Sequence, residues 1–315
     1  MEHASQPVLL DDGPEGIADA ARRLREGGLV AVPTETVYGL AARADRDGSV
    51  AAIYRAKGRP SFNPLIVHVA DLASGQALAQ FDARALSLAE AFWPGALTMV
   101  LPLREGAPIA AAVTAGLPTL ALRCPAHPVM RAVIAATGLP LAAPSANRSG
   151  GVSPTEAAHV VTSLGGGVDA VIDGGACEAG LESTIVALRG DGRWQMLRPG
   201  PITEARIAAV LGVPSDPVVS QDIEAPGQLA SHYAPGKPVR LDATDAAADE
   251  FHIGFGPVAG HSSLSASGDL AEAAARLYAL LHAGAGAPQP RIAIAPIPES
   301  DIGTAINDRL RRAAA

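Results

Sequence analysis

Residues 29–69 gather hydroxyl, carboxylate, cationic, amide and imidazole side chains in one short stretch. Residues 33–36 read PTET, residues 57–60 read KGRP and residues 63–69 read NPLIVHV. Ammonium and guanidinium groups beside hydroxyls suit anion-rich ligands, because they donate charge-assisted hydrogen bonds to phosphate and carboxylate oxygens. The stretch therefore predicts a site for a nucleotide or an amino-acid carboxylate.

Two strands must hold these side chains in place. Residues 29–32 are apolar and predict a buried strand that ends at Pro33, which has no N–H to donate. Residues 33–36 then form a loop at a strand end, where α/β proteins usually carry binding groups. A second strand is predicted over residues 65–69 and includes His68.

The helix predicted between these strands has Asp47 as its N-cap and Gly58 as its C-cap. Arg55, Lys57 and Arg59 lie near its end, where cations also stabilise the helix dipole. Lys57 is one of only two lysines in the chain, and an ammonium contacts phosphate differently from a guanidinium. Taken singly, each of these residues has an ordinary structural explanation: the cations stabilise a helix end, and the histidine is a hydrogen-bonded core residue.

Composition narrows the class of protein. The chain has 315 residues, enough for two domains, and 48% of them are apolar, which supports a sizeable core. The net charge of −8 and the 3% of aromatic residues argue against an RNA-binding module, which commonly has basic patches and aromatic stacking platforms. A local cationic pocket remains compatible with this charge.

Cys124 and Cys177 are the only cysteines and form no C-x-x-C pattern, so a thiolate metal site is not indicated. We expect two small buried thiols in a reducing cytoplasm, with their pairing left open. The first residues lack a basic region followed by an apolar one, and no apolar run approaches about 20 residues. We therefore expect neither a signal peptide nor a membrane span.

Predicted strands and helices are mixed along the chain without strict alternation. This order favours a twisted mixed sheet flanked by helices over a regular doubly wound fold. Ser153-Pro154-Thr155-Glu156 has the form of a capping box that opens one helix. Helices are predicted over residues 15–26, 71–80, 82–92, 126–137, 153–164, 203–211, 270–282 and 304–314, and further strands over 97–103, 119–123, 139–143, 169–173, 183–188, 194–198, 239–241, 251–255 and 292–295.

Residues 213–238 contain five prolines and little periodicity, so they are interpreted as a semi-rigid linker. The linker separates a predicted first domain, residues 1–212, from a smaller α/β domain, residues 239–315. His232 and Tyr233 lie in the linker, although a pure spacer needs neither. From the residues alone, they favour a contact that docks the linker on one domain.

Several motifs together resemble a known family. PTETVYGL, KGRP and NPLIVHV, in this order and spacing, are similar to the L-threonylcarbamoyladenylate synthase family, the YrdC-like proteins. The similarity covers nearly the whole chain and is typical of the long, two-domain form. It continues through residues 119–123 (TLALR), 143–147 (APSAN), 183–185 (STI), 198–200 (RPG), 232–235 (HYAP) and 308–313 (DRLRRA).

The resemblance implies a nucleotidyltransferase that joins L-threonine, bicarbonate or CO2, and ATP into L-threonylcarbamoyl-AMP, with release of pyrophosphate. It implies Mg²⁺ with the ATP, because charge spreads over the phosphate oxygens during transfer. The product would pass to a tRNA threonylcarbamoyl transferase complex that modifies an adenosine next to the anticodon. A weak tRNA contact is left open, and the expected compartment is the cytoplasm.

The resemblance also implies roles for individual residues, while the ligands of a metal stay unidentified and Glu35 is only a candidate. The linker would reach over the active site, with Tyr233 closing on the nucleotide. Ser145, Ser153 and Arg198 also fit ordinary turn, cap and strand-end positions. The implied catalytic residues are Lys57 and Arg59, facing the phosphates; the threonine-binding residues are Thr36, His68, Arg123, Ala143 and Ser183; and the ATP-binding residues are Arg59, Asn63, Thr119, Ser145, Ser153, Arg198 and Tyr233.

Two other functions compete with this interpretation of the motifs. A carbamoyl-transfer enzyme of hydrogenase maturation contains a similar domain, but such proteins are larger and carry zinc-finger cysteines, whereas this chain has two isolated cysteines. A ligand-binding protein without turnover is harder to dismiss from sequence. Release of pyrophosphate would separate the last alternative from the enzyme.

Overall fold

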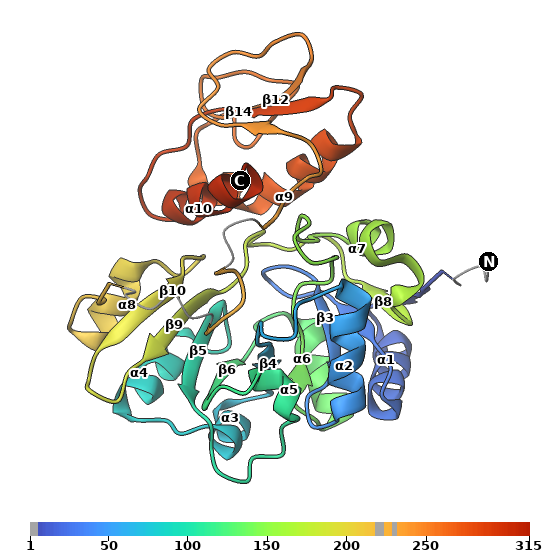
Figure 1. The fold of residues 1–315 in the computed structure, drawn as a ribbon, viewed down its shortest axis with the longest axis vertical. Coiled ribbons are helices and arrows are strands. Elements are labelled where there is room, and N and C mark those ends of the chain that lie inside the picture. Colours follow the sequence, from blue (N-terminus) through green and yellow to red (C-terminus); the bar gives the residue numbers. More distant parts are fainter. Residues whose placement is uncertain (1–5, 218–223, 229–231) are drawn as a thin grey trace.

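The computed structural model describes residues 6–217, 224–228 and 232–315, which form two α/β units (Figure 1). The larger unit contains one mixed sheet with helices on both faces, and the smaller unit lies at the C-terminus. The predicted fold class, a twisted mixed sheet flanked by helices with a smaller C-terminal α/β domain, is confirmed.

The large sheet combines parallel pairs with antiparallel ones, as expected for a mixed sheet. Among the described residues its ten strands lie side by side in the order β1 (Val8–Asp11), β8 (Ala170–Asp173), β2 (Val30–Val32), β3 (Gly39–Arg43), β7 (Leu141–Ala142), β4 (Ile66–His68), β6 (Thr119–Arg123), β5 (Leu97–Pro102), β9 (Thr184–Leu188) and β10 (Trp194–Arg198).

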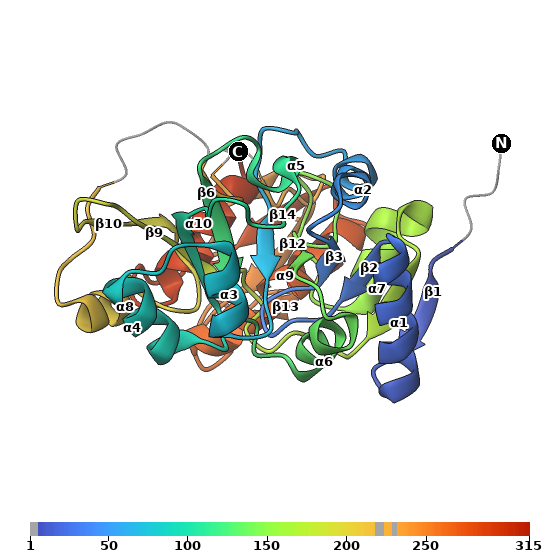
Figure 2. The ribbon, with the colours of Figure 1, turned by 90° about the horizontal axis from the view of Figure 1, so that it is seen from below.

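Helices cover both faces of this sheet, as Figure 2 shows for α1 and α6 on one face and α2 on the other. Alternate side chains of β2 accordingly enter two hydrophobic clusters. Ala31 packs with Val50 of α2, whereas Val30 and Val32 pack with Leu24 of α1. The helices of the larger unit are α1 (Pro14–Glu26), α2 (Asp47–Lys57), α3 (Leu72–Leu78), α4 (Ala83–Phe92), α5 (Ala111–Thr114), α6 (Pro128–Thr137), α7 (Ala157–Leu164) and α8 (Glu204–Leu211).

Capping residues explain several helix boundaries. The carboxylate of Asp82 accepts an N–H from the first turn of α4, and Gly58 and Gly138 take the left-handed conformation that ends α2 and α6. The prediction for α2 is wrong by one residue at its start, because Arg46 is the N-cap and Asp47 already belongs to the helix.

The capping box predicted at Ser153 is wrong. Helix α7 begins only at Ala157, and the N-cap is Glu156, whose side chain makes no capping hydrogen bond. Ser153 donates its hydroxyl to Glu182 at 2.5 Å instead. A carboxylate distant in sequence has therefore taken the hydroxyl that a local cap would use.

Gly39 begins strand β3. This strand pairs antiparallel with β2 and with β7. A side chain at Gly39 would bring its Cβ to 3.2 Å from the Cβ of Ala143. Glycine therefore avoids a tight contact with the side chain of Ala143 on the neighbouring segment.

The smaller unit is a parallel sheet with two helices. Its strands lie in the order β11 (Val239–Arg240), β14 (Arg291–Ile294), β12 (Glu250–Gly254) and β13 (Ser262–Ser263), and its helices are α9 (Leu270–Gly286) and α10 (Gly303–Ala313). Figure 1 shows α9 and α10 on the side of this sheet that faces the larger unit. Its hydrophobic cluster also includes Val37, Val152, Leu181 and Tyr233, so the two units share a buried interface.

Parts of the predicted linker lie outside the described residues, namely 218–223 and 229–231. The parts that are described contact the larger unit. Glu224 forms an ion pair with Arg189 at 2.7 Å, and the N–H of Ala234 donates to the carbonyl of Gly150 at 2.8 Å. The domain limits at residues 212 and 239 stay predictions.

Candidate active site

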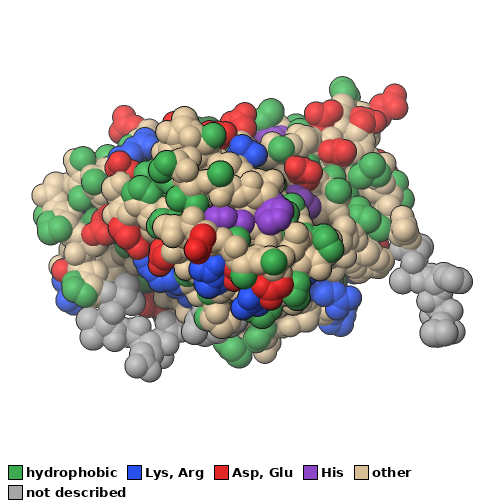
Figure 3. Space-filling view, turned by 90° about the horizontal axis from the view of Figure 1, so that it is seen from above, with side chains coloured by type: hydrophobic (Ala, Val, Ile, Leu, Met, Phe, Trp, Pro, Cys, Tyr) green, Lys and Arg blue, Asp and Glu red, His purple; other side chains and the backbone are tan. Residues whose placement is uncertain are grey.

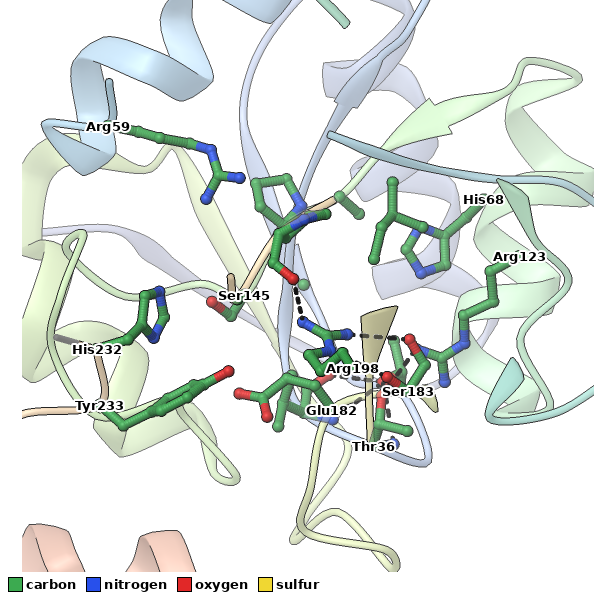
Figure 4. Close-up of a pocket in the computed structure, with 18 residues that line it drawn as sticks. Thr36, Arg59, His68, Arg123, Ser145, Glu182, Ser183, Arg198, His232 and Tyr233 are labelled. Atoms are coloured by element: carbon green, nitrogen blue, oxygen red, sulfur yellow. Dashed lines mark hydrogen bonds between the residues drawn. The ribbon is translucent and has the colours of Figure 1, made fainter. Parts of the chain in front are cut away.

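A pocket lies where strand ends of the large sheet meet the linker, and its cavity volume is about 40 Å³. Figure 4 shows Arg59, His232 and Tyr233 on one side, His68 and Arg123 on the other, and Arg198 between them. Nine of the predicted site residues line the pocket: Thr36, Arg59, His68, Arg123, Ala143, Ser145, Ser183, Arg198 and Tyr233.

The loop after β2 is shaped by a hydroxyl. Thr34 donates its hydroxyl to the carbonyl of Val37 at 2.6 Å and accepts the backbone N–H of Thr36 at 3.1 Å. This local turn is typical of threonine in loops. It directs the side chain of Thr36 into the pocket, where its hydroxyl accepts a hydrogen bond from Arg123 at 2.8 Å.

Arg123 stands at the end of β6 and is almost fully buried. Its Nη2 lies 2.7 Å from Oε1 of Glu35, and its Nε donates to the carbonyl of Gly95 at 3.1 Å. Burial alone would raise the pKa of Glu35, but the charge of Arg123 outweighs it and lowers the pKa to about 2. The guanidinium therefore already holds one carboxylate, the chemistry predicted for its substrate.

His68 lies at the end of β4 with its ring facing the pocket (Figure 4). Within the described part of the chain, neither ring nitrogen has a hydrogen-bond partner. Burial lowers the pKa of His68 to about 3, so the imidazole is neutral at neutral pH. A buried polar group without a partner is rare in a folded protein, which favours a ligand contact over a core role.

Arg198 and Ser183 form the centre of the pocket wall. Arg198, at the end of β10, donates to the carbonyl of Ser183 at 3.1 Å and to its hydroxyl at 3.2 Å. A third hydrogen bond, 3.4 Å long, reaches the carbonyl of Pro226 in the linker. Burial lowers the pKa of Arg198. This arginine thus joins the sheet to the linker and is not an ordinary strand-end residue.

Arg59 and Asn63 are held together in the loop after α2. Arg59 donates to the side-chain oxygen of Asn63 at 2.6 Å and to the carbonyl of Pro64 at 2.9 Å. Burial lowers the pKa of Arg59 to about 10, which still leaves it charged at neutral pH. Arg59 lines the pocket, whereas Asn63 lies behind it and orients the guanidinium.

Lys57 does not line the pocket. Its ammonium donates to the carbonyls of Ser145 and Asn147, both at 2.5 Å. Burial, followed by the nearby charge of Arg59, holds the pKa of Lys57 well below its usual range. In this structure Lys57 fixes the loop that brings Ser145 to the pocket, and its predicted catalytic role stays a prediction.

Thr119 and Ser153 also lie outside the pocket lining. Thr119 begins β6, at the end opposite Arg123. Ser153 is fully buried and reaches the pocket only through Glu182. Their predicted contacts to the nucleotide stay predictions.

Glu182 and His232 line the pocket but were not predicted as site residues. Glu182 immediately precedes the STI motif, and His232 belongs to the HYAP motif, so their positions were the available signal. Burial alone would raise the pKa of Glu182. The charges of Arg309 and Arg198 outweigh this effect and lower the pKa to about 2. The pocket thus contains a second carboxylate besides Glu35.

Linker residues cover the pocket. Gly227 has a positive φ of 88° and approaches Arg198 so closely that a Cβ would lie 2.8 Å from its Cδ. Tyr233 is 1% exposed and packs against His232 and Tyr278. The cavity of about 40 Å³ has room for about one or two water molecules.

Among the described residues, no three His, Cys, Asp or Glu side chains lie together in a metal-binding arrangement. Glu35 and Glu182 are each paired with an arginine. Cys124 and Cys177 are free and buried, as expected. Within the same part of the chain, no helix has both the length and the apolar character needed to cross a bilayer.

Comparison with known proteins extends the sequence resemblance. The sequence model of the Sua5/YciO/YrdC family, described as "Telomere recombination", matches residues 22–200, more than half of the chain. A second model, described as "Threonylcarbamoyl-AMP synthase, C-terminal domain", matches residues 202–315. The two models together account for both α/β units.

Individual relatives agree with these matches. The threonylcarbamoyl-AMP synthase of Bacillus subtilis is 47% identical over 230 residues, or 71% of this chain and 66% of that protein. The synthase of Pyrococcus abyssi is 45% identical over 228 residues, 70% of this chain and 66% of that protein. The chain thus spans about two thirds of these curated relatives.

The similarity extends to solved structures over nearly the full length. The crystal structure of P. abyssi Sua5 complexed with L-threonine matches with a TM-score of 0.87 at 34% identity, covering 98% of this chain and 97% of that one. Sequence and structure comparisons therefore agree with the resemblance found in the motifs. The chain belongs to the Sua5/YciO/YrdC family and carries the C-terminal domain of threonylcarbamoyl-AMP synthases.

Proposed function

We propose that this protein is a nucleotidyltransferase that makes L-threonylcarbamoyl-AMP and pyrophosphate from L-threonine, bicarbonate or CO2, and ATP. One observation carries the proposal: Arg59, Arg123 and Arg198 converge with hydroxyls on a single pocket, in a fold that matches a relative complexed with L-threonine. Three guanidinium groups suit a carboxylate and a chain of phosphates.

Threonine binds at the Arg123 side of the pocket. Its carboxylate meets the Arg123 guanidinium and shares it with Glu35, while Thr36 contributes a hydroxyl. The neutral ring of His68 accepts a hydrogen bond from the threonine amine or hydroxyl without adding positive charge. Ser183 and the backbone of Ala143 complete this side. The amine is then free to become a carbamate.

ATP binds at the side formed by Arg59, Arg198 and the linker. The carbamate oxygen attacks the α-phosphorus in line with the departing pyrophosphate, and buried cations stabilise the charge on the phosphate oxygens. ATP enters as its Mg²⁺ complex, with the metal held by phosphate oxygens and water. Lys57 lies outside the pocket lining and contributes indirectly, because its ammonium holds the loop that carries Ser145.

The product is a mixed anhydride of a carbamate and a phosphate, so it is reactive and must be consumed quickly. We assign it to a downstream tRNA threonylcarbamoyl transferase complex, which modifies an adenosine next to the anticodon. On the face shown in Figure 3, lysine and arginine side chains of the described residues are interspersed with aspartate and glutamate. Any tRNA contact made through this face is therefore weak.

Pyrophosphate release tests the proposal. Wild-type protein is incubated with MgATP and bicarbonate, with and without L-threonine, and the product is identified by mass spectrometry. We expect release that depends on threonine and L-threonylcarbamoyl-AMP as the product. Binding of threonine and MgATP without release would instead support a ligand-binding protein without turnover.

A further inference from the structure

Arg309 of α10 is a fully buried charge at the interface between the two units. Its Nε donates to Glu182 at 2.8 Å, its Nη2 donates to the carbonyl of Pro199 at 2.9 Å, and its Nη1 donates to Asp308 at 2.6 Å. The guanidinium carbon also lies 5.3 Å from the ring centre of Tyr233. Burying an arginine is costly, and these contacts compensate for the lost hydration.

Each contact outside the C-terminal domain leads to the pocket. Glu182 lines the pocket and is followed by Ser183, which binds Arg198. Pro199 directly follows Arg198 in the chain. Tyr233 belongs to the linker and lines the pocket on the same side. One guanidinium from the C-terminal domain therefore contacts three separate segments of the same pocket wall.

The carboxylate of Glu182 depends on the C-terminal domain for its partners. Besides Arg309, it accepts the hydroxyl of Tyr278 from α9 at 2.8 Å and the hydroxyl of Ser153 at 2.5 Å. Gly180, two residues earlier, lies against α9 so closely that a Cβ would come within 2.5 Å of its backbone. The segment that presents Glu182 is thus clamped by the C-terminal helices.

We propose that Arg309 is a positioning residue of the active site, through which the C-terminal domain holds Glu182, Arg198 and Tyr233 in place for ATP. The inference rests on the proposed function for the identity of the ligand. Without Arg309, Glu182 becomes a buried carboxylate without its cation, on the wall that faces the phosphates of ATP. Threonine, bound at the Arg123 side, is little affected.

The test compares Arg309→Met with the double variant Glu182→Gln/Arg309→Met and with Arg291→Met. Arg291 is the control, because it lies in the same domain, is half-exposed and pairs with Asp249 at the surface. KM for ATP and KM for threonine come from pyrophosphate release. The Kd of MgATP comes from calorimetry and does not require turnover.

For Arg309→Met we expect KM and Kd for ATP to rise at least tenfold, with KM for threonine changed less than threefold. The double variant should recover part of the ATP affinity, because it removes the unpaired carboxylate but still lacks the contacts of Arg309 with Pro199 and Tyr233. Arg291→Met should match wild type. A loss of kcat at unchanged KM and Kd for ATP, or equal increases for both substrates, would overturn the proposal, since a merely structural role predicts those results.

Tyr278→Phe covers the case in which Arg309→Met does not fold, since it removes only one hydrogen bond to Glu182. It should raise the Kd of MgATP about threefold, and an unchanged Kd would count against the proposal. Wild-type protein that binds MgATP without threonine-dependent release would refute the proposed function alone. Wild-type protein that does not bind MgATP would refute both.

Discussion

The two sides of the pocket are built in different ways. The proposed threonine side is local: His68 and Arg123 lie at ends of β-strands in one sheet, Thr36 lies in the loop after β2, and the hydrogen-bond and ion-pair partners of Arg123 belong to the same domain. The proposed ATP side depends on segments that are far apart in the sequence, because Arg198 contacts the linker and Glu182 contacts two helices of the C-terminal domain. One side can thus be complete in the catalytic domain, whereas the other needs the rest of the chain.

The largest effect is expected from Arg123→Ala, which breaks the threonine side. The loss of a buried, charged hydrogen-bond donor should lower kcat/KM for threonine about a thousandfold, roughly 4 kcal/mol. KM for ATP should change much less. Steady-state kinetics with each substrate varied in turn measures both, and Arg104→Ala is the control because this arginine is exposed and does not line the pocket.

Arg123→Ala also leaves Glu35 without its ion-pair partner, which could destabilise the fold. The double variant Glu35→Gln/Arg123→Ala removes that buried charge. We expect it to restore the free energy of unfolding but not the binding of threonine. Recovery of threonine binding in the double variant would show that Arg123 is not the carboxylate receptor.

Arg198→Ala should break the ATP side with a smaller effect. We expect KM for ATP to rise about a hundredfold, roughly 2.7 kcal/mol, because a buried cation is removed from the phosphates. KM for threonine should rise only a few-fold, through the loss of support for Ser183. A larger increase for threonine than for ATP would mean that the two sides are not separate.

Lowering the pH should destabilise the folded protein, because it contains a buried neutral histidine on each side of the pocket. Burial lowers the pKa of His68 and that of His232 to about 3, from an ordinary value of 6.5. Between these values the unfolded chain binds more protons, so the free energy of unfolding falls as the pH falls. Each histidine should contribute a loss of about 1.3 kcal/mol between pH 7 and pH 5.5.

Urea unfolding at the two pH values tests this for wild type, His68→Asn and His232→Asn. Each variant should lose less stability on acidification than wild type does. Glu35 and Glu182 do not contribute in this window, because their pKa values are lowered to about 2 and they stay ionised. Equal losses in all three proteins would contradict the prediction.

Tyr233→Phe should have the smallest effect on stability and kinetics of the variants considered. It tests whether the linker contributes to the ATP side of the pocket. The hydroxyl of Tyr233 has no hydrogen-bond partner within the described residues, so its removal should change the free energy of unfolding by less than about 0.5 kcal/mol. If the hydroxyl contacts ATP, KM for ATP should rise about threefold while KM for threonine stays constant. An unchanged KM for ATP would limit Tyr233 to packing.

The sequence predicted the strands around Arg123 well because their signals are local. The strand over residues 119–123 has the predicted limits, and the loop after Pro33 lies at a strand end as expected. Apolar runs flanked by proline and glycine carry this information within a few residues. The placement of Thr36, His68 and Arg123 on one pocket follows from those strand ends.

The ATP side was harder to predict because its contacts join residues far apart in the chain. Glu182 meets Tyr278 and Arg309, and no periodicity links positions separated in this way. The same carboxylate explains why Ser153 does not cap a helix. The sequence singled out Lys57 for a catalytic role, which stays a prediction, but it could not reveal that two backbone carbonyls accept hydrogen bonds from its ammonium.

The hydrophobic cluster shared by the two units has a thermodynamic consequence. Val37 belongs to the PTETVYGL motif, yet it packs in the same cluster as Leu277 and Ile306 of the C-terminal domain. Domains that share a core of this kind should unfold together, so we expect a single calorimetric transition for the full chain. Truncation after Gly212 would expose Val37, Val152 and Leu181, and should lower the melting temperature of what remains. We therefore expect that the predicted domain boundary does not separate two independently unfolding units.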